Sequence, residues 1–95
     1  MVHHLVLFQF KEEARGHIDE AVSRFRGMVG KVEVIRQLHA GRDFLHLARS
    51  FDIGLSVQFD DRHGLEVYDN HPNHVPVKQF LAPLLERSVS VDFEE

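Results

Sequence analysis

The stretch Phe51-Asp-Ile-Gly-Leu-Ser-Val-Gln-Phe59 alternates strictly between large apolar residues and small or polar ones. Because successive side chains of a strand point to opposite faces, this alternation predicts a β-strand with one buried face. Residues 88–94 alternate in the same way, with Val89, Val91 and Phe93 on one face. Residues 2–10 carry β-branched and aromatic side chains on both faces, and residues 32–41 are a less regular fourth candidate. The chain therefore predicts four strands.

The segments between these strands have the pattern of amphipathic helices. Residues 13–29 carry apolar side chains at a spacing near 3.6 residues, which predicts a helix that ends at Gly30. Residues 61–70 predict a short helix capped by Asp60 or Asp61, and residues 74–86 predict another. We expect Pro83 to kink this last helix or to end it early, because proline has no N–H to donate and its ring crowds the preceding turn.

The elements follow one another as β-α-β-β-α-β. This is the ferredoxin-like order of an α+β domain, in which a four-stranded antiparallel sheet carries its helices on one face. We expect a single domain over residues 1–95. The other face of the sheet, which includes Leu5 and Leu7, would be left in water. We therefore expect a homodimer in which two such faces pack together and form a dimeric α+β barrel.

Composition narrows the range of partners. With 95 residues and a net charge of −4, the chain has no basic cluster of the kind that attracts nucleic acid. No apolar run is long enough to span a membrane, and residues 1–8 lack the basic region and cleavage site of a signal peptide. The chain has no cysteine, so no disulfide framework exists. We expect a cytoplasmic protein that binds neither nucleic acid nor membrane.

The segment Tyr68-Asp-Asn-His71-Pro72-Asn-His74 brings a phenol and two imidazoles together. A histidine can remove a proton from the carbon beside a carbonyl group, and a tyrosine can stabilise the enolate oxygen that forms. The structural alternative is that the Tyr68 hydroxyl binds a backbone carbonyl while His74 caps the next helix. A metal shared by His71 and His74 is a further alternative, although zinc usually takes four ligands, or three and a water.

Several motifs together suggest a family. They are the opening Val2-His-His-Leu-Val-Leu-Phe-Gln-Phe-Lys11, Gly41-Arg42-Asp43, Leu65-x-x-Tyr68-x-x-His71-Pro72-x-His74, Phe80-Leu81-x-Pro83-Leu84 and Val91-Asp92-Phe93-Glu94. With them the chain resembles, over its whole length, the Dabb family, the stress-responsive dimeric α/β-barrel domain. The resemblance implies a ferredoxin-like subunit and a homodimer whose sheets form a barrel.

The resemblance also bears on function. The family includes plant stress proteins and a plant polyketide cyclase, olivetolic acid cyclase, in which a tyrosine and a histidine act as acid and base on a poly-β-keto substrate. Tyr68 and His74 occupy those positions here, and His4 matches a histidine on the first strand of the cyclase. A further pocket histidine of the cyclase is replaced by Ile53, which implies a different pocket.

We therefore expect a small apolar cavity between sheet and helices that binds a small carbonyl or aromatic compound. Tyr68 and His74 are the candidate acid/base pair for a cyclase- or isomerase-like proton transfer that needs no organic cofactor and no metal. The other candidate binding residues are His4, Val6, Phe8, Val22, Phe25 and His71. The alternative is a non-enzymatic stress-response module that acts through its dimer or through a protein partner. A third reading, a monooxygenase-like dimer, is favoured by no feature of the chain.

Overall fold

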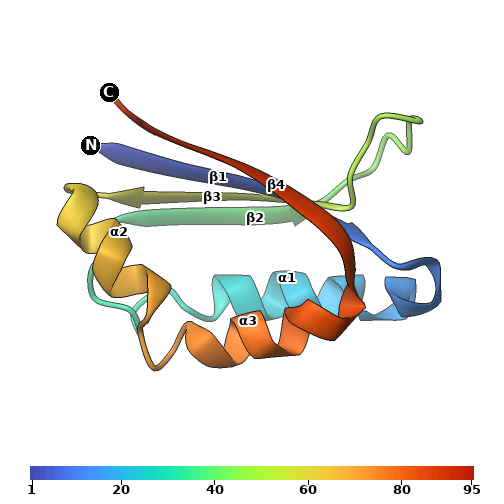
Figure 1. Cartoon of the computed structure of the whole chain (residues 1–95), viewed down its shortest axis with the longest axis horizontal. Helices are drawn as coiled ribbons and strands as arrows, with labels where there is room; N and C mark the ends of the chain where they lie inside the picture. The colour runs from blue at the N-terminus through green and yellow to red at the C-terminus, as the bar shows by residue number, and fades with distance from the viewer.

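In the computed structural model, which describes residues 1–95, the chain forms one four-stranded antiparallel sheet with all helices on one face (Figure 1). The strands are β1 (Val2–Phe10), β2 (Gln37–Arg42), β3 (Ile53–Phe59) and β4 (Leu85–Glu94), in the spatial order β2-β3-β1-β4. The helices are α1 (Ile18–Arg26), α2 (Arg62–Asp69) and α3 (Val75–Leu81), with 3₁₀ turns η1 (Glu12–His17) and η2 (Ala82–Leu84). The predicted ferredoxin-like order is confirmed. No helix is both long enough and apolar enough to cross a bilayer.

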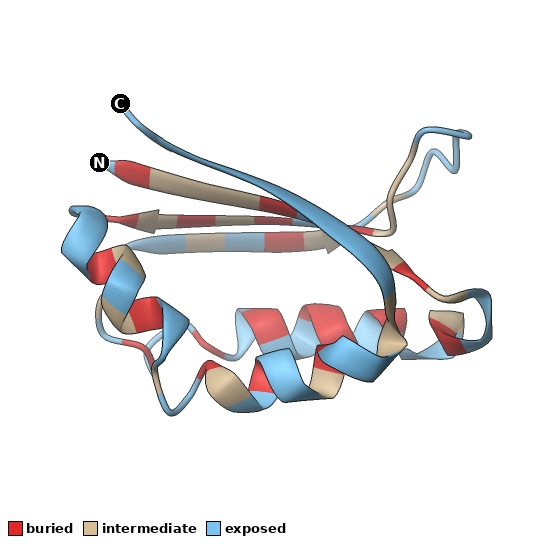
Figure 2. Cartoon of the chain, in the orientation of Figure 1, coloured by how far each residue is buried: buried red, intermediate tan, exposed pale blue.

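The core lies between the sheet and the helices (Figure 2). Alternate residues of β3 supply Ile53, Leu55, Val57 and Phe59, each no more than 4 % exposed. This is the alternation that the sequence predicted, with Phe51 lying just before the strand. β1 buries its residues on the same side, whereas β4 has no fully buried residue. The sheet therefore has a complete core under β1 and β3 and an incomplete one under β4.

The first helix is shorter than the apolar pattern predicted. Residues 12–17 form a 3₁₀ turn, and α1 ends at Arg26 with Gly27 as its C-cap. Glycine is a poor helix former, and Gly27 stops the helix one turn before Gly30. Gly30 instead adopts a φ of +83° in the turn that follows, a conformation that glycine reaches without strain. Met28 stays buried although it is no longer helical.

The prediction of a strand over residues 32–41 was wrong in its first half. β2 begins only at Gln37, because the turn after α1 continues through Val32 and Ile35. The N–H of Val32 donates to the carbonyl oxygen of Met28 at 3.1 Å, and that of Ile35 donates to Val32 at 3.1 Å. These local bonds use backbone groups that a strand would need. Val32 packs in the core from the turn, so its apolar character reflects burial and not strand structure.

The second half of the chain follows its local signals closely. The Asp61 carboxylate caps α2 by accepting a hydrogen bond from the N–H of Gly64 at 3.0 Å. Helix α2 ends before His71-Pro72, and α3 gives way to a 3₁₀ turn at Ala82. The early end expected from Pro83 is thus confirmed. The break between α2 and α3 turns the chain so that both helices border β4 across a gap (Figure 1).

Candidate functional site

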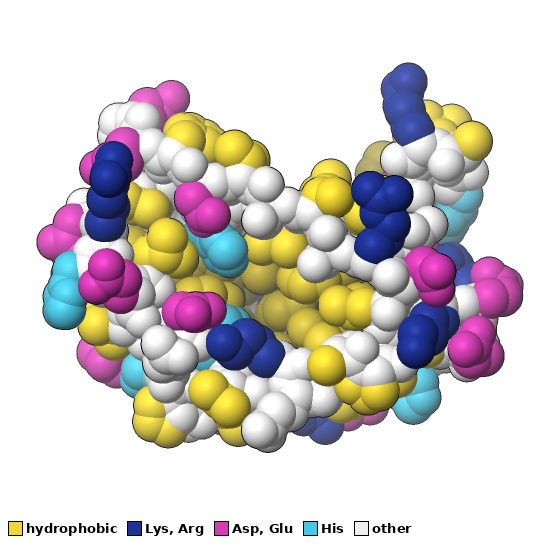
Figure 3. Space-filling model, viewed as in Figure 1, with side chains coloured by type: hydrophobic (Ala, Val, Ile, Leu, Met, Phe, Trp, Pro, Cys, Tyr) yellow, Lys and Arg dark blue, Asp and Glu magenta, His cyan; other side chains and the backbone are white.

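A cavity of about 460 Å³ occupies the gap where the core is incomplete. It lies between β1 and β4 on one side and α2 and α3 on the other, and Figure 3 shows it as a hollow with an apolar floor and charged groups at its rim. Its walls are formed by His4, Val6, Phe8, Phe25, Leu55, Leu65, Glu66, Tyr68, Asp69, His74, Lys78, Leu81, Ser88, Ser90 and Asp92. The size suits a small organic molecule.

Tyr68 is the most deeply placed polar residue of the wall. Its side chain comes from the last turn of α2 and is only 2 % exposed. The ring packs against Phe59 at 5.1 Å and against His74 at 3.9 Å between ring centres. Its hydroxyl is buried and has no hydrogen-bond partner. Burial raises the pKa of Tyr68 well above its usual value, so the hydroxyl stays protonated and available as a donor.

His74 lies beside Tyr68 at the start of α3 and is 7 % exposed. It makes no capping bond, and its Nδ1 instead lies 2.8 Å from the carbonyl oxygen of Tyr68. A carbonyl oxygen only accepts, so Nδ1 carries the hydrogen, and in the neutral ring Nε2 keeps the lone pair. Burial lowers the pKa of His74, which favours that neutral ring. The pair therefore offers a donor and a base to the same cavity.

His4 joins this pair from β1. Its ring meets the Tyr68 ring edge-on at 5.8 Å between centres. On its other side, Nδ1 of His4 bonds the carboxylate of Asp92, which lies directly opposite on β4. A carboxylate that accepts from Nδ1 fixes the tautomer and leaves Nε2 as the free nitrogen. Tyr68 thus has an imidazole stacked on its face and another at its edge.

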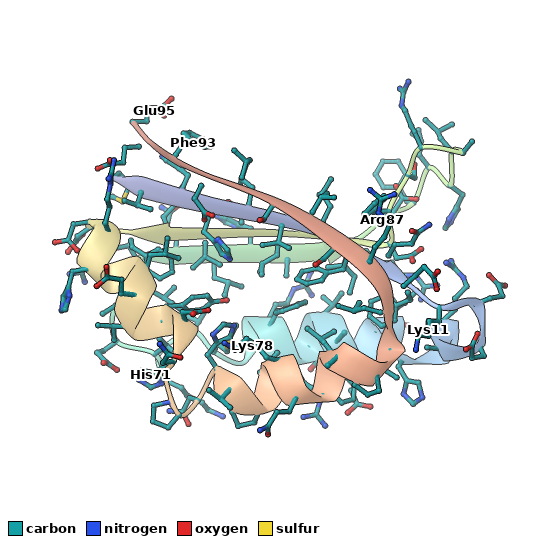
Figure 4. The ribbon with its side chains drawn as sticks, in the orientation of Figure 1. Lys11, His71, Lys78, Arg87, Phe93 and Glu95 are labelled. Carbon is teal, nitrogen blue, oxygen red and sulfur yellow. The ribbon has the colours of Figure 1, made fainter.

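The remaining candidates from the sequence divide into two groups. Val6, Phe8 and Phe25 line the cavity as expected. Val22 does not; it is packed in the core beneath α1. His71 does not line the cavity either, and it lies at the loop between α2 and α3 (Figure 4). There its Nε2 bonds Glu33 at 3.0 Å and its Nδ1 accepts from the N–H of Asn73 at 3.0 Å.

His71 and His74 therefore have separate partners. One holds a loop and the other faces the cavity, so the His-x-x-His spacing does not bring the two imidazoles to a common site. No group of three or more His, Cys, Asp or Glu side chains is gathered so that it could hold a metal ion.

The charges around the cavity are mostly negative. Three carboxylates, those of Glu66, Asp69 and Asp92, stand in the wall with a single cation, Lys78. Lys78 lies at the mouth (Figure 4), where its Nζ donates to the main-chain oxygen of Asp69 at 2.6 Å and to the Asp69 carboxylate at 3.3 Å. Because its charge is already met by Asp69, the cavity offers no free cation to an anionic ligand.

The model of the Stress responsive A/B Barrel Domain, Dabb, matches residues 2–95. The chain belongs to the Dabb family. The Dabb relatives include a stress-response A/B barrel domain-containing protein of Arabidopsis thaliana, which is 25 % identical over 93 residues, or 95 % of this chain and 82 % of the relative.

Solved structures share the Dabb fold. A dimeric ferredoxin-like protein of unknown function from Bacteroides fragilis is 26 % identical, with a TM-score of 0.89 over 99 % of this chain and 95 % of its own. A hydroxynitrile lyase from Passiflora edulis is 15 % identical, with a TM-score of 0.83 over 97 % of this chain and 90 % of its own. At that identity the likeness concerns the fold alone.

Sequence reasoning missed the wall that β4 contributes to this Dabb cavity. Ser88, Ser90 and Asp92 alternate with the apolar residues of β4 and face the helices. The alternation was visible in the sequence, but it does not say which set faces inward. The pairing of β1 with β4 supplies that information, because Asp92 stands opposite His4, which lines the cavity.

Proposed function

We propose that this Dabb protein binds a small uncharged molecule with a carbonyl group in its cavity and moves a proton on it with Tyr68 and His74. The buried hydroxyl of Tyr68 carries the proposal. A buried polar group is almost always hydrogen-bonded, and an unpaired one in a cavity wall marks the place where a ligand oxygen binds. A carbonyl oxygen is the acceptor that matches a hydroxyl donor.

The chemistry follows from the two protonation states. Nε2 of His74 takes a proton from the carbon beside the carbonyl, and the electron pair of that C–H bond moves onto the carbonyl oxygen as an enolate. Tyr68 stabilises this oxygen by donating its O–H, as an oxyanion hole does. The imidazolium of His74 then returns the proton to another carbon in an isomerisation. In a cyclisation the enolate carbon attacks a second carbonyl of the ligand, and His74 protonates the alkoxide that forms.

The walls favour an uncharged ligand. The floor is built of aromatic and aliphatic side chains, including Phe8, Phe25 and Leu55. The carboxylates of the wall repel an anion, and the only lysine is bound to Asp69. An aromatic ketone or a β-diketone meets both conditions, whereas a free carboxylic acid at neutral pH does not.

We also propose that the protein is a homodimer through the open face of its sheet. Leu7, Val91 and Phe93 stand on that face and are between 40 and 53 % exposed. Figure 4 shows Phe93 on the side of the sheet away from the helices. An apolar face of this kind on a small domain is typical of an interface between copies. The dimeric ferredoxin-like relative from Bacteroides fragilis supports it. This face also favours the second candidate function, a stress-response module that acts through its dimer.

The test is thermal unfolding of the purified protein against acetophenone, a β-diketone and divalent metal salts. Tyr68→Phe and His74→Asn are run in parallel. Asparagine keeps an N–H near the position of Nδ1, so it can still donate to the Tyr68 carbonyl while it removes Nε2. We expect a ketone to raise the melting temperature of the wild type and not that of Tyr68→Phe. Deuterium uptake at the carbon beside the carbonyl should require both residues. If no ketone stabilises the wild type, the module is the better account.

A further inference from the structure

The loop between β2 and β3 holds Phe44, the most exposed large apolar side chain of the chain. It is 85 % exposed, and its neighbours Leu45 and Leu47 are 52 % and 46 % exposed. We call residues 43–51 the arm. Single exposed apolar residues are common on proteins, but three on one short loop form a patch, and such patches mark interaction surfaces.

The arm has a defined conformation. Its base is closed by the N–H of Asp43, which donates to the carbonyl oxygen of Asp52 at 2.8 Å. The Asp43 carboxylate accepts from the N–H of His46 at 2.8 Å, and the Ser50 hydroxyl accepts from the N–H of Leu47 at 3.1 Å. A loop held by its own hydrogen bonds loses little conformational entropy when it docks. The exposure of its apolar residues is therefore built into the loop.

Asp52 anchors the arm to the rest of the domain. Its carboxylate accepts from the N–H of Phe10 at 2.8 Å and from the guanidinium of Arg15 at 2.6 Å. Its own N–H donates to the carbonyl oxygen of Phe8 at 2.8 Å. These bonds tie the arm to the end of β1, so the direction in which it projects is fixed by the sheet.

The arm projects to the side of the sheet that carries no helix (Figure 1). A groove connects it with the open face, because Leu7, Gly54 and Gly41 lie in one row across β1, β3 and β2. The two glycines leave the floor of this row low beside Leu7, and Phe44 stands at its end. In Figure 3 the upper surface is correspondingly hollowed between the arm and the opposite end of the sheet.

We infer that the arm is part of the dimer interface, and that Phe44 and Leu45 of each copy are buried against the open sheet face of the other copy. The inference rests on the homodimer proposed above. A second copy is the occupant that fits, because the apolar surface of the arm is continuous, through the glycine groove, with the face that the dimer covers. Two-fold symmetry then makes every contact of the arm occur twice.

A tryptophan in place of Phe44 tests this directly, because the chain has no tryptophan of its own. Phe44→Trp is studied by fluorescence across a dilution series while sedimentation follows the oligomeric state. We expect the emission to shift to shorter wavelength as the dimer forms. Val29→Trp is the matched control, because Val29 is 58 % exposed in the turn after α1, on the helix side, and its emission should not respond to dimerisation.

The outcomes separate the two proposals. A dimer in which the indole at position 44 emits like the solvent-exposed control overturns the role of the arm and leaves the homodimer standing. A monomer at micromolar concentration overturns both. Phe44→Ser gives an independent reading: it should raise the dissociation constant of the dimer by at least roughly 100-fold, because a buried phenylalanine is lost on each of two copies. Val29→Ser should leave that constant unchanged, and a change of less than about threefold in Phe44→Ser would contradict the inference.

Discussion

Replacing Tyr68 by phenylalanine should make the free protein more stable, not less. The Tyr68 hydroxyl loses its hydrogen bonds to water on folding and gains none in the protein. Such an unpaired group costs about 1–3 kcal/mol. The ring itself should not move, because it is 2 % exposed and is held between Phe59 and His74 at 5.1 and 3.9 Å. Tyr68→Phe therefore removes the unfavourable group and keeps the packing.

The expected gain lies at the lower end of that range. The hydroxyl borders a cavity of about 460 Å³ that water can enter, so part of its loss is recovered in solution. We expect the free energy of unfolding to rise by about 1 kcal/mol and the melting temperature by roughly 4–8 °C. Urea titration followed by circular dichroism measures this, at a fixed protomer concentration because a dimer's stability depends on it. The denaturant slope serves as the control and should match that of the wild type.

The opposite result would refute the reasoning. A hydroxyl that has a partner in the free protein contributes about 1 kcal/mol to stability, and its removal would destabilise by that amount. Tyr68→Phe would then be less stable than the wild type, and the claim that the hydroxyl is kept free for a ligand would fail. The ligand experiment must be read with this one, since a variant that is more stable and yet insensitive to ketones has lost binding and not folding.

Three further predictions concern the groups around Tyr68. Because burial lowers the pKa of His74, the unfolded chain binds more protons than the folded one as the pH falls, so stability should decline below about pH 6.5. His74→Asn should lose part of this decline in urea titrations across that range, and pH profiles of the same shape would contradict it. Asp92→Asn should let the ring of His4 carry its hydrogen on Nε2, which nitrogen NMR reports, while stability changes by less than about 1 kcal/mol because the pair is partly exposed. An unchanged tautomer would show that Asp92 does not orient the ring. Glu66→Gln should improve binding of 4-acetylbenzoate relative to acetophenone by about twofold at low salt, and an equal effect on both ligands would exclude a role for its charge.

The fold was predictable because each element carries its own local signal. The alternation before Phe59, the carboxylate of Asp61 at the start of α2 and the position of Pro83 each act within a few residues, and each was confirmed. The start of β2 failed for a physical reason. Val32 is apolar because it is buried, and burial alone does not distinguish a strand from a turn that packs on the core.

The site was less predictable because it depends on pairing between distant segments. Tyr68 and His74 are close in sequence, and a single bend between α2 and α3 is enough to stack them. Asp92 meets His4 only through the register of β4 on β1, which no local pattern encodes. His71 shows the converse, because its nearness in sequence to His74 did not bring the two side chains to one site.

The cavity and the open apolar face have one origin, the register of β4. The pairing of β1 with β4 shifts between Gln9 and Phe10, where Leu85 lies opposite Phe10 and Arg87 opposite Gln9. The extra residue reverses which side each following residue faces, because side chains alternate along a strand. Before the shift, Leu85 packs against the core. After it, Val89 and the other apolar residues of β4 face away from the helices, while serines and Asp92 face toward them. Without the shift, the apolar set would fill the cavity and the open face would be polar. One irregularity in the strand thus keeps the core incomplete beside Tyr68 and supplies the apolar surface for a second copy.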